Sequence, residues 1–266
     1  MNILLLDAGN TRLKWAVLDL GPAVVADSEL GRLSQFGACG YHADEVLEPL
    51  LAGYWSGLPD IGRVMMASVA GEAFALKLQR YCEQRWGLTP ENLVTPASGG
   101  GVRNAYAEPQ RLGIDRWLAL VAARGISSGA VCVVDCGSAV TVDYLDAAGE
   151  HQGGLILPGL AMLFRSLSSG ADNLADMVPG HAGDQSSKQV AHLAQDTAAA
   201  ITGGVLTMLV AAIDRIVSEV VPMDAVVTCV ITGGDGARLQ PLLTGQWLYR
   251  PHLVLEGMAI MIEEKG

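Results

Sequence analysis

A repeated pattern in the two halves of the chain limits the possible folds more than any other feature. The segment LLLDAGNTRLKWAVLD at residues 4–19 is echoed by CVVDCGSAVTVDYLD at residues 132–146. Each is an apolar strand that ends in Asp-x-Gly, followed by a second alternating strand that ends in Leu-Asp. Asp7 and Asp135 lie 128 positions apart, close to half of the 266-residue chain. The repeat predicts two duplicated domains, each led by a β-hairpin, and a chance match of one hairpin is the alternative.

Hydrophobic periodicity places helices and strands in alternation after each hairpin, which predicts an α/β fold. The predicted strands cover residues 2–7, 13–19, 64–69, 131–135, 141–146 and 225–232. The predicted helices cover residues 44–53, 72–86, 113–124, 188–220 and 253–264. We place the two domains at residues 1–114 and 115–266, and allow the last helix to pack back on the N-terminal domain.

Composition and charge narrow the class of partner. The formal net charge is -11 and the pI is near 4.8, which argues against nucleic acid and leaves small solutes. The N-terminus lacks the basic flank of a signal peptide. The longest apolar stretch, residues 198–213, is shorter than the roughly 20 residues that cross a bilayer. We therefore expect a cytoplasmic protein without a membrane partner. The five cysteines form no CxxC pair, so we expect buried free thiols.

The turn after each repeated strand has the chemistry of a phosphate site. Small residues such as Gly9 let a phosphate approach the backbone N–H groups, and Asn10 and Thr11 add side-chain donors. A bare carboxylate at Asp7 would repel phosphate, so its presence predicts a divalent cation between the acid and a nucleotide. The same reasoning applies to Asp135, Gly137 and Ser138, and two such turns would clamp a polyphosphate.

Two further glycine turns leave alternatives open. ITGGDG at residues 231–236 follows an apolar strand, and could admit a flat or anionic ligand or serve as a plain strand-to-helix turn. GGLILPG at residues 153–159 favours a structural junction.

The segment GVRNAYAEPQRLGIDRW at residues 101–117 places Asp115 and Arg116 at the start of an apolar helix. An acid in the first helical turn is favoured by the helix dipole, so Asp115 could be a helix cap. The alternative is that Asp115 accepts a proton from a substrate hydroxyl while Arg116 holds an anionic group.

These motifs, in this order and over nearly the whole chain, resemble the type III pantothenate kinases. The family belongs to the acetate and sugar kinase, Hsp70 and actin superfamily. The resemblance implies two duplicated RNase H-like domains, an actin-like ATPase fold with the active-site cleft between them. It also implies ATP-dependent phosphorylation of pantothenate to 4′-phosphopantothenate, the first step of coenzyme A synthesis, with magnesium as a cofactor.

The resemblance also implies roles for individual residues. Asp115 matches the general base and Asp135 the ligand of a monovalent cation, potassium or ammonium, which competes with magnesium at Asp135. The ATP-binding residues are Asp7, Ala8, Gly9, Asn10, Thr11, Arg12, Leu13, Lys14 and Ser138. The substrate-binding residues are Tyr106, Gly113, Ile114, Asp115, Arg116 and Thr197. Ser138 stands where the family usually has threonine, and Cys136 where it often has a bulkier aliphatic residue.

The family resemblance further implies a homodimer with the acceptor pocket and the cation site near its interface. Two other functions stay open. One is another small-metabolite kinase of the superfamily, which a panel of acceptors would reveal. The other is a non-catalytic nucleotide-binding regulator, whose mark would be loss of the acids at 7, 115 or 135, and all three acids are present.

Overall fold

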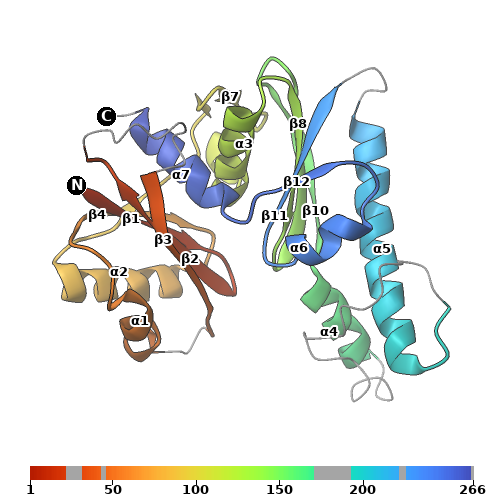
Figure 1. Ribbon diagram of the computed structural model, residues 1–266, viewed down its shortest axis with the longest axis horizontal. Coiled ribbons are helices and arrows are strands. Elements are labelled where there is room, and N and C mark those ends of the chain that lie inside the picture. Colours follow the sequence, from red (N-terminus) through yellow and green to blue (C-terminus); the bar gives the residue numbers. More distant parts are fainter. Residues whose placement is uncertain (22–31, 43–45, 171–192, 222–225, 265–266) are drawn as a thin grey trace. The chain divides into compact units, whose positions relative to one another are not determined.

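The computed structural model describes residues 1–21, 32–42, 46–170, 193–221 and 226–264 (Figure 1). The chain forms two compact units: unit 1 comprises Met1–Gly125 and Leu253–Gly266, and unit 2 comprises Ile126–His252. The division therefore falls near the end of helix α3 (Ile114–Ile126), whereas the sequence placed it at the start of this helix, between residues 114 and 115. Helix α7 (Leu253–Glu263) belongs to unit 1, because its Gly257 packs on the backbone of Leu118 with no room for a Cβ.

Unit 1 contains a five-stranded mixed sheet in the order β3-β2-β1-β4-β5. Its strands are β1 (Asn2–Ala8), β2 (Arg12–Asp19), β3 (Leu33–Gly40), β4 (Ile61–Ser68) and β5 (Glu91–Asn92). β1 pairs antiparallel with β2 and parallel with β4. After β5 come the small hairpin of β6 (Ser98–Gly99) and β7 (Val102–Arg103), and the 3-10 turn η2 (Pro109–Arg111).

Unit 2 repeats this sheet, in the order β10-β9-β8-β11-β12. Its strands are β8 (Ala130–Cys136), β9 (Ala139–Leu145), β10 (His151–Pro158), β11 (Val227–Thr232) and β12 (Trp247–Tyr249). β8 pairs antiparallel with β9 and parallel with β11, as β1 does with β2 and β4. The two sheets therefore match strand for strand, which confirms the predicted duplication of an α/β domain.

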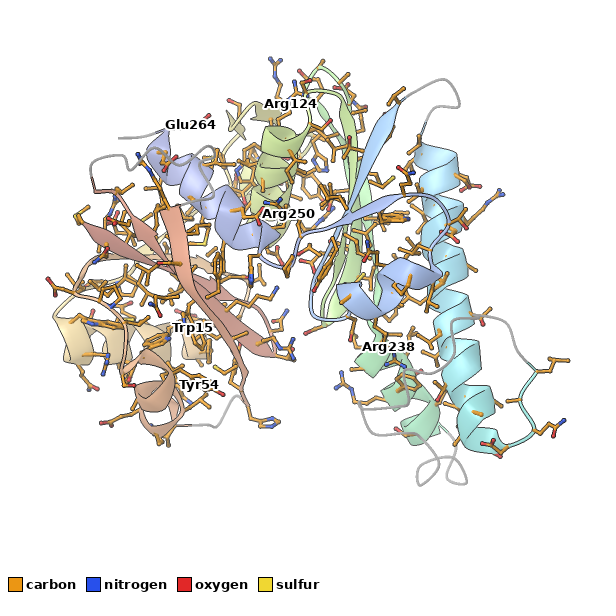
Figure 2. All side chains as sticks on the ribbon, viewed as in Figure 1. Trp15, Tyr54, Arg124, Arg238, Arg250 and Glu264 are labelled. Carbon is orange, nitrogen blue, oxygen red and sulfur yellow. The ribbon has the colours of Figure 1, made fainter. Side chains whose placement is uncertain are left out.

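Helices α1 (Leu47–Trp55) and α2 (Glu72–Trp86) pack on one face of the unit 1 sheet. Alternate residues of β1 (Leu4, Leu6 and Ala8) join this core, which places Asp7 on the opposite face. Figure 2 shows Trp15 of β2 beside Tyr54 of α1, with ring centroids 5.4 Å apart at 61°. An edge-on aromatic pair of this kind adds to the burial that fixes α1 on the sheet.

Helices α4 (Leu160–Gly170), α5 (Thr197–Val220) and α6 (Gly236–Leu239), and the turn η4 (Gln240–Leu242), supply the core of unit 2. The apolar stretch judged too short to cross a bilayer is part of α5, which has 24 residues and extends to Val220. By length and composition alone α5 could cross a membrane, with a hydropathy of 1.7 and 28% of its most apolar window buried. The helix is therefore longer than the apolar stretch within it. One side of α5 packs in the core through Val205, Leu209 and Ile213.

All predicted helices and strands are confirmed with shifts at their ends, although the predicted starts at residues 44, 188 and 225 lie outside the described residues. The sequence missed the edge strands β3, β5, β10 and β12, the short strands β6 and β7, and helices α4 and α6. Most residues of β3 and β10 are exposed or half-buried, so these strands lack apolar alternation. The five cysteines are free and four of them are buried, as expected.

Candidate phosphate and acceptor site

The turn between β1 and β2 is the first of the two predicted phosphate turns. The Gly9 N–H donates to the Arg12 carbonyl at 3.1 Å and closes the turn. Asp7 is the penultimate residue of β1 and has only 7% of its surface exposed. Its Oδ2 lies 4.0 Å from Nζ of Lys14, its register partner on β2. The turn therefore combines a nearly buried carboxylate with a lysine ammonium, and Asn10 and Thr11 at its tip are exposed.

Tyr41, which follows β3, holds this turn from one side. Its hydroxyl donates a short hydrogen bond to the Gly9 carbonyl, and its N–H donates to the Thr11 carbonyl at 3.2 Å. Its ring stacks on Phe74 of α2, with centroids 3.6 Å apart and planes 10° apart. Burial, with a smaller contribution from the charge of Asp7, raises the pKa of Tyr41 to about 12. The hydroxyl therefore remains a donor at neutral pH.

The turn between β8 and β9 is closed in the same way, by the Gly137 N–H donating to the Ala139 carbonyl at 3.0 Å. Two glycines from other connections pack on it. A Cβ on Gly159 would lie 2.5 Å from the carbonyl oxygens of both Gly137 and Ser138. Gly233, with a φ of +90°, is equally close to the backbone of Cys136.

These contacts assign the two glycine motifs a packing role. Gly159 ends the GGLILPG motif and Gly233 belongs to ITGGDG. The ITGGDG turn is also hydrogen-bonded to the hairpin, since the Asp235 N–H donates to the Cys136 carbonyl at 3.0 Å. A side chain at either glycine would displace the turn that carries Ser138 and the strand end that carries Asp135.

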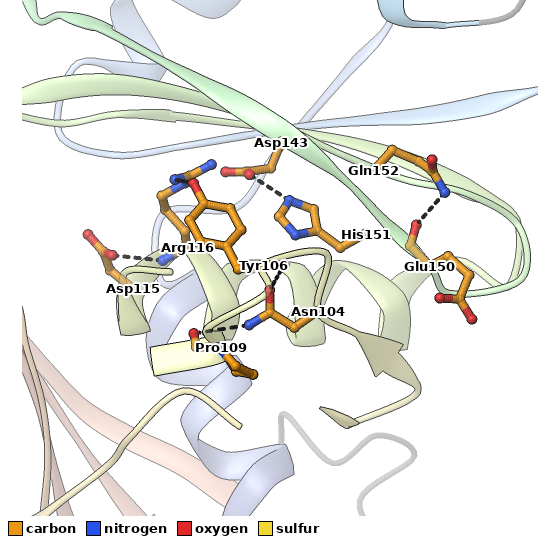
Figure 3. Close-up of polar contacts among 9 residues, drawn as sticks. All are labelled: Asn104, Tyr106, Pro109, Asp115, Arg116, Asp143, Glu150, His151 and Gln152. Carbon is orange, nitrogen blue, oxygen red and sulfur yellow. Dashed lines mark hydrogen bonds and ion pairs between the residues drawn. The ribbon is translucent and has the colours of Figure 1, made fainter. Parts of the chain in front are cut away.

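Asp115, Arg116 and Tyr106 lie together at the start of α3 (Figure 3). Arg116 is buried, with 7% exposed, and donates from a terminal nitrogen to the Tyr106 hydroxyl at 3.1 Å. Asn104 fixes the loop before them, because its Oδ1 accepts the Tyr106 N–H at 2.9 Å. Asp115 lies in the first turn of α3, and its Oδ1 accepts the N–H of the next residue, Arg116, at 2.8 Å. A helix cap instead accepts the N–H two or three residues further on, so this bond does not by itself support the helix-cap interpretation. A base role for the same carboxylate remains a proposal.

Gly113 makes room for the Asp115 carboxylate. A Cβ at position 113 would lie 2.6 Å from Asp115 Oδ1 and 3.8 Å from a methyl group of Val69. Ile114 is buried with 8% exposed, so it anchors the first turn of α3 in the core. In the Gly-Ile-Asp-Arg motif, the glycine thus leaves room for the carboxylate of the aspartate, the isoleucine packs in the core, and the arginine is buried.

The predicted site residues divide between the two units. The β1–β2 turn, residues 7–14, and the acceptor residues 106 and 113–116 belong to unit 1, whereas Asp135, Ser138 and Thr197 belong to unit 2. Thr197 is the exposed first residue of α5, which begins where the Asp196 side chain accepts the Ala199 N–H at 2.9 Å.

Thr232 and Asp135 are candidates to hold a cation together. They are register partners at the ends of the parallel strands β11 and β8, so their side chains share one face of the sheet. Thr232 is 1% exposed, and its hydroxyl oxygen has no hydrogen-bond partner in the described part of the chain. A buried oxygen beside a carboxylate suits the oxygen preference of hard cations. Sequence reasoning missed Thr232, as it missed Tyr41.

Two other features of unit 2 involve none of the predicted site residues. His151 Nε2 lies 2.9 Å from Asp143 Oδ1, both side chains being buried, and the pair links β9 to β10. A pocket of about 580 Å³ is lined by Val142, Tyr144, Asp146, Gln152, Gly153, Gly154, Leu155, Ile216 and Val220. It contains none of the predicted site residues.

Comparison with solved structures gives the fold first. The ethanolamine utilization protein EutJ of Carboxydothermus hydrogenoformans matches with a TM-score of 0.54 at 10% identity, over 98% of this chain and 90% of that one. The activator of the 2-hydroxyisocaproyl-CoA dehydratase from Clostridium difficile, solved with bound ADPNP, matches with a TM-score of 0.53 at 14% identity, over 99% and 95%. The chain therefore has the actin-like ATPase fold, as predicted.

Sequence comparison gives the family. The model of the type III pantothenate kinases matches residues 3–219. Type III pantothenate kinases of Nitrosococcus oceani and Halorhodospira halophila are 41% and 36% identical, over 97% and 96% of this chain and 92% and 95% of theirs. The chain belongs to the type III pantothenate kinase family. This confirms the predicted family and the prediction of a kinase.

Proposed function

We propose that this chain transfers the γ-phosphoryl group of ATP to pantothenate and forms 4′-phosphopantothenate, the first step of coenzyme A biosynthesis. The cluster of Asp115, Arg116 and Tyr106 is the observation that carries the proposal, because a carboxylate, a buried guanidinium and a phenol suit an acceptor with a hydroxyl and a carboxylate. Membership of the family supplies the identity of that acceptor.

On the acceptor side, Asp115 orients the primary hydroxyl of pantothenate and takes its proton as the oxygen attacks the γ-phosphorus. Arg116 pairs with an anionic group of the substrate, and its bond to Tyr106 sets the direction of the guanidinium. Gly113 and Ile114 keep the Asp115 carboxylate in place. Thr197 contributes a further substrate contact from the start of α5.

On the donor side, residues 7–14 and Ser138 bind the phosphates of ATP through backbone N–H groups, hydroxyls and the Lys14 ammonium. Asp7 would hold magnesium, directly or through water, and magnesium bound with ATP neutralises the charge that builds up on the phosphates. The chain itself contributes mainly the positions of these donors, which is the main source of catalysis in phosphoryl transfer.

Asp135 is proposed to bind a monovalent cation, potassium or ammonium. The buried hydroxyl of its register partner Thr232 supports this assignment, because it offers a second oxygen at the same strand ends. We also propose a homodimer in the cytoplasm, with neither nucleic acid nor a membrane as a partner. The net charge of -11 supports the first exclusion.

Replacement of the proposed base tests the chemistry. We expect Asp115→Asn to lower kcat for pantothenate by about 10²- to 10⁴-fold, the range of general-base contributions, with little change in nucleotide affinity. Asp60→Asn, at an exposed aspartate, is the matched control and should behave as the wild type. The readout is coupled ADP release with and without potassium. Near-normal turnover in Asp115→Asn would remove Asp115 from the base role.

An acceptor panel tests the substrate. Pantothenate, acetate and several hexoses are assayed under the same conditions, with direct detection of the phosphorylated product. Phosphorylation of acetate or a sugar, with pantothenate inert, would favour the other small-metabolite kinase. ATP binding without transfer to any acceptor would favour the nucleotide-binding regulator.

A further inference from the structure

Tyr41 and Gly159 occupy the same place in the duplicated fold. Each lies directly after the third strand of its sheet, β3 or β10, and each contacts the turn that joins the first two strands. In unit 2 the contact is steric, since Gly159 packs on the carbonyls of Gly137 and Ser138. In unit 1 it is a pair of hydrogen bonds from one tyrosine.

We infer that Tyr41 is a positioning residue for the donor nucleotide. The Tyr41 hydroxyl fixes the peptide plane between Gly9 and Asn10, in the turn proposed to bind the ATP phosphates. This inference rests on the proposed function. A trans peptide is planar, with its C=O and N–H pointing in opposite directions. The hydrogen bond that holds the Gly9 carbonyl toward Tyr41 therefore directs the Asn10 N–H away from Tyr41.

The surroundings of Tyr41 make it suitable for this task. Tyr41 has 8% of its surface exposed and its ring stacks on Phe74 of α2, so the position of the hydroxyl is set by the core of unit 1. The Tyr41 N–H holds the Thr11 carbonyl independently. A glycine-containing turn is otherwise permissive in its backbone angles, so external bonds are needed to give its N–H donors one fixed arrangement.

Tyr41→Phe isolates the hydroxyl, because it keeps the stacked ring and the backbone bond to Thr11. We expect affinity for the non-hydrolysable analogue AMP-PNP, measured by calorimetry with magnesium, to fall about fivefold, the effect of one hydrogen bond. KM for ATP should rise to a similar extent, while KM for pantothenate stays unchanged. Hydrogen exchange of the peptide that covers the β1–β2 turn should become faster.

Tyr81→Phe is the matched control, since Tyr81 is a second buried tyrosine of the same core, with 7% exposed, and lies on α2. It should leave nucleotide affinity unchanged. Thr11→Ala, within the proposed phosphate turn, tests the proposed function separately and should lower the affinity for AMP-PNP.

The outcomes distinguish failure of the Tyr41 inference from failure of the proposed phosphate-binding turn. Wild-type affinity in Tyr41→Phe, with weaker binding in Thr11→Ala, would overturn the inference and leave the phosphate turn intact. Unchanged affinity in both variants would overturn the inference and the assignment of the turn together. An equal loss of affinity for ATP and pantothenate in Tyr41→Phe would indicate general structural damage and would also overturn the inference.

Discussion

Gly233 lies against Asp135: a Cβ on Gly233 would stand 2.5 Å from Asp135 Oδ1. The contact joins the end of β11 to the end of β8, where the cation is proposed to bind. No real Cβ tolerates this distance, so a side chain at position 233 must move the carboxylate or the strand end.

We therefore expect Gly233→Ala to destabilise unit 2 and weaken the dependence of the activity on potassium. The cost should be about 1–3 kcal/mol from overpacking, added to the strain of a φ of +90° in alanine. Gly245→Ala is the control, since Gly245 has the same φ of +90° but nothing within 4 Å of its Cβ position. Urea denaturation and a potassium titration measure the two effects. Equal behaviour of the two variants would show that only backbone strain matters.

Strands that are buried could be predicted from the sequence, and strands that are mostly exposed could not. Strands β1 and β8 are buried along nearly their whole length, so their apolar pattern and the repeat were visible in the sequence. Edge strand β10 buries only His151 of its eight residues, and its exposed Leu155 and Ile156 follow no core-facing alternation. The packing of α7 on α3, which the predicted domain division allowed for, comes from a close backbone contact of Gly257 with Leu118.

In the candidate site, too, some residues could be predicted from the sequence and others could not. Asp7, Asp135 and the Gly-Ile-Asp-Arg motif carry recognisable residue types at recognisable spacings. Tyr41 and Thr232 do not, because their importance comes from neighbours distant in the chain: a turn 32 residues before Tyr41 and a strand end beside Thr232. The glycines of ITGGDG and GGLILPG were visible in the sequence, but their packing on the β8–β9 turn could be found only in the structure.

Arg116 provides a test of the acceptor site. Lysine keeps the charge but loses the planar set of donors that reaches Tyr106 and that we propose also binds a substrate anion. We expect Arg116→Lys to raise KM for pantothenate at least tenfold, corresponding to about 1.4 kcal/mol, with ATP affinity unchanged. Arg111→Lys is the matched control, because Arg111 lies in the same segment with an exposed side chain. Steady-state kinetics with each substrate varied in turn give both constants. Unchanged pantothenate kinetics in Arg116→Lys would remove Arg116 from the pocket.

Because the pKa of the Tyr41 hydroxyl is raised, we expect this group to make the folded protein less stable at alkaline pH. Its pKa is raised from 10.0 to about 12 in the folded chain, chiefly by burial. The folded state therefore holds this proton more tightly than the unfolded state. The resulting stabilisation is complete below pH 10 and is lost as the pH rises toward 12. Burial also raises the pKa of Tyr81 and of Cys82, so the difference between wild type and Tyr41→Phe isolates the Tyr41 hydroxyl. We expect the free energy of unfolding of Tyr41→Phe to fall less steeply between pH 10 and 12, and parallel curves would contradict the assignment.

The five thiols should differ sharply in reactivity. Burial raises the pKa of Cys82 to about 12 and also raises those of Cys132 and Cys136, so little thiolate forms at these positions at pH 8. Cys229 is the one cysteine that is not fully buried, although burial raises its pKa too. We therefore expect DTNB at pH 8 to modify at most one thiol of the native protein, slowly, and all five after denaturation. Cys229→Ser should remove the native reaction while leaving the other four thiols protected. Rapid native modification of Cys132 as well as Cys229 would mean that the sheet of unit 2 opens in solution, because Cys132 is fully buried on β8, beside its register partner Cys229 on β11.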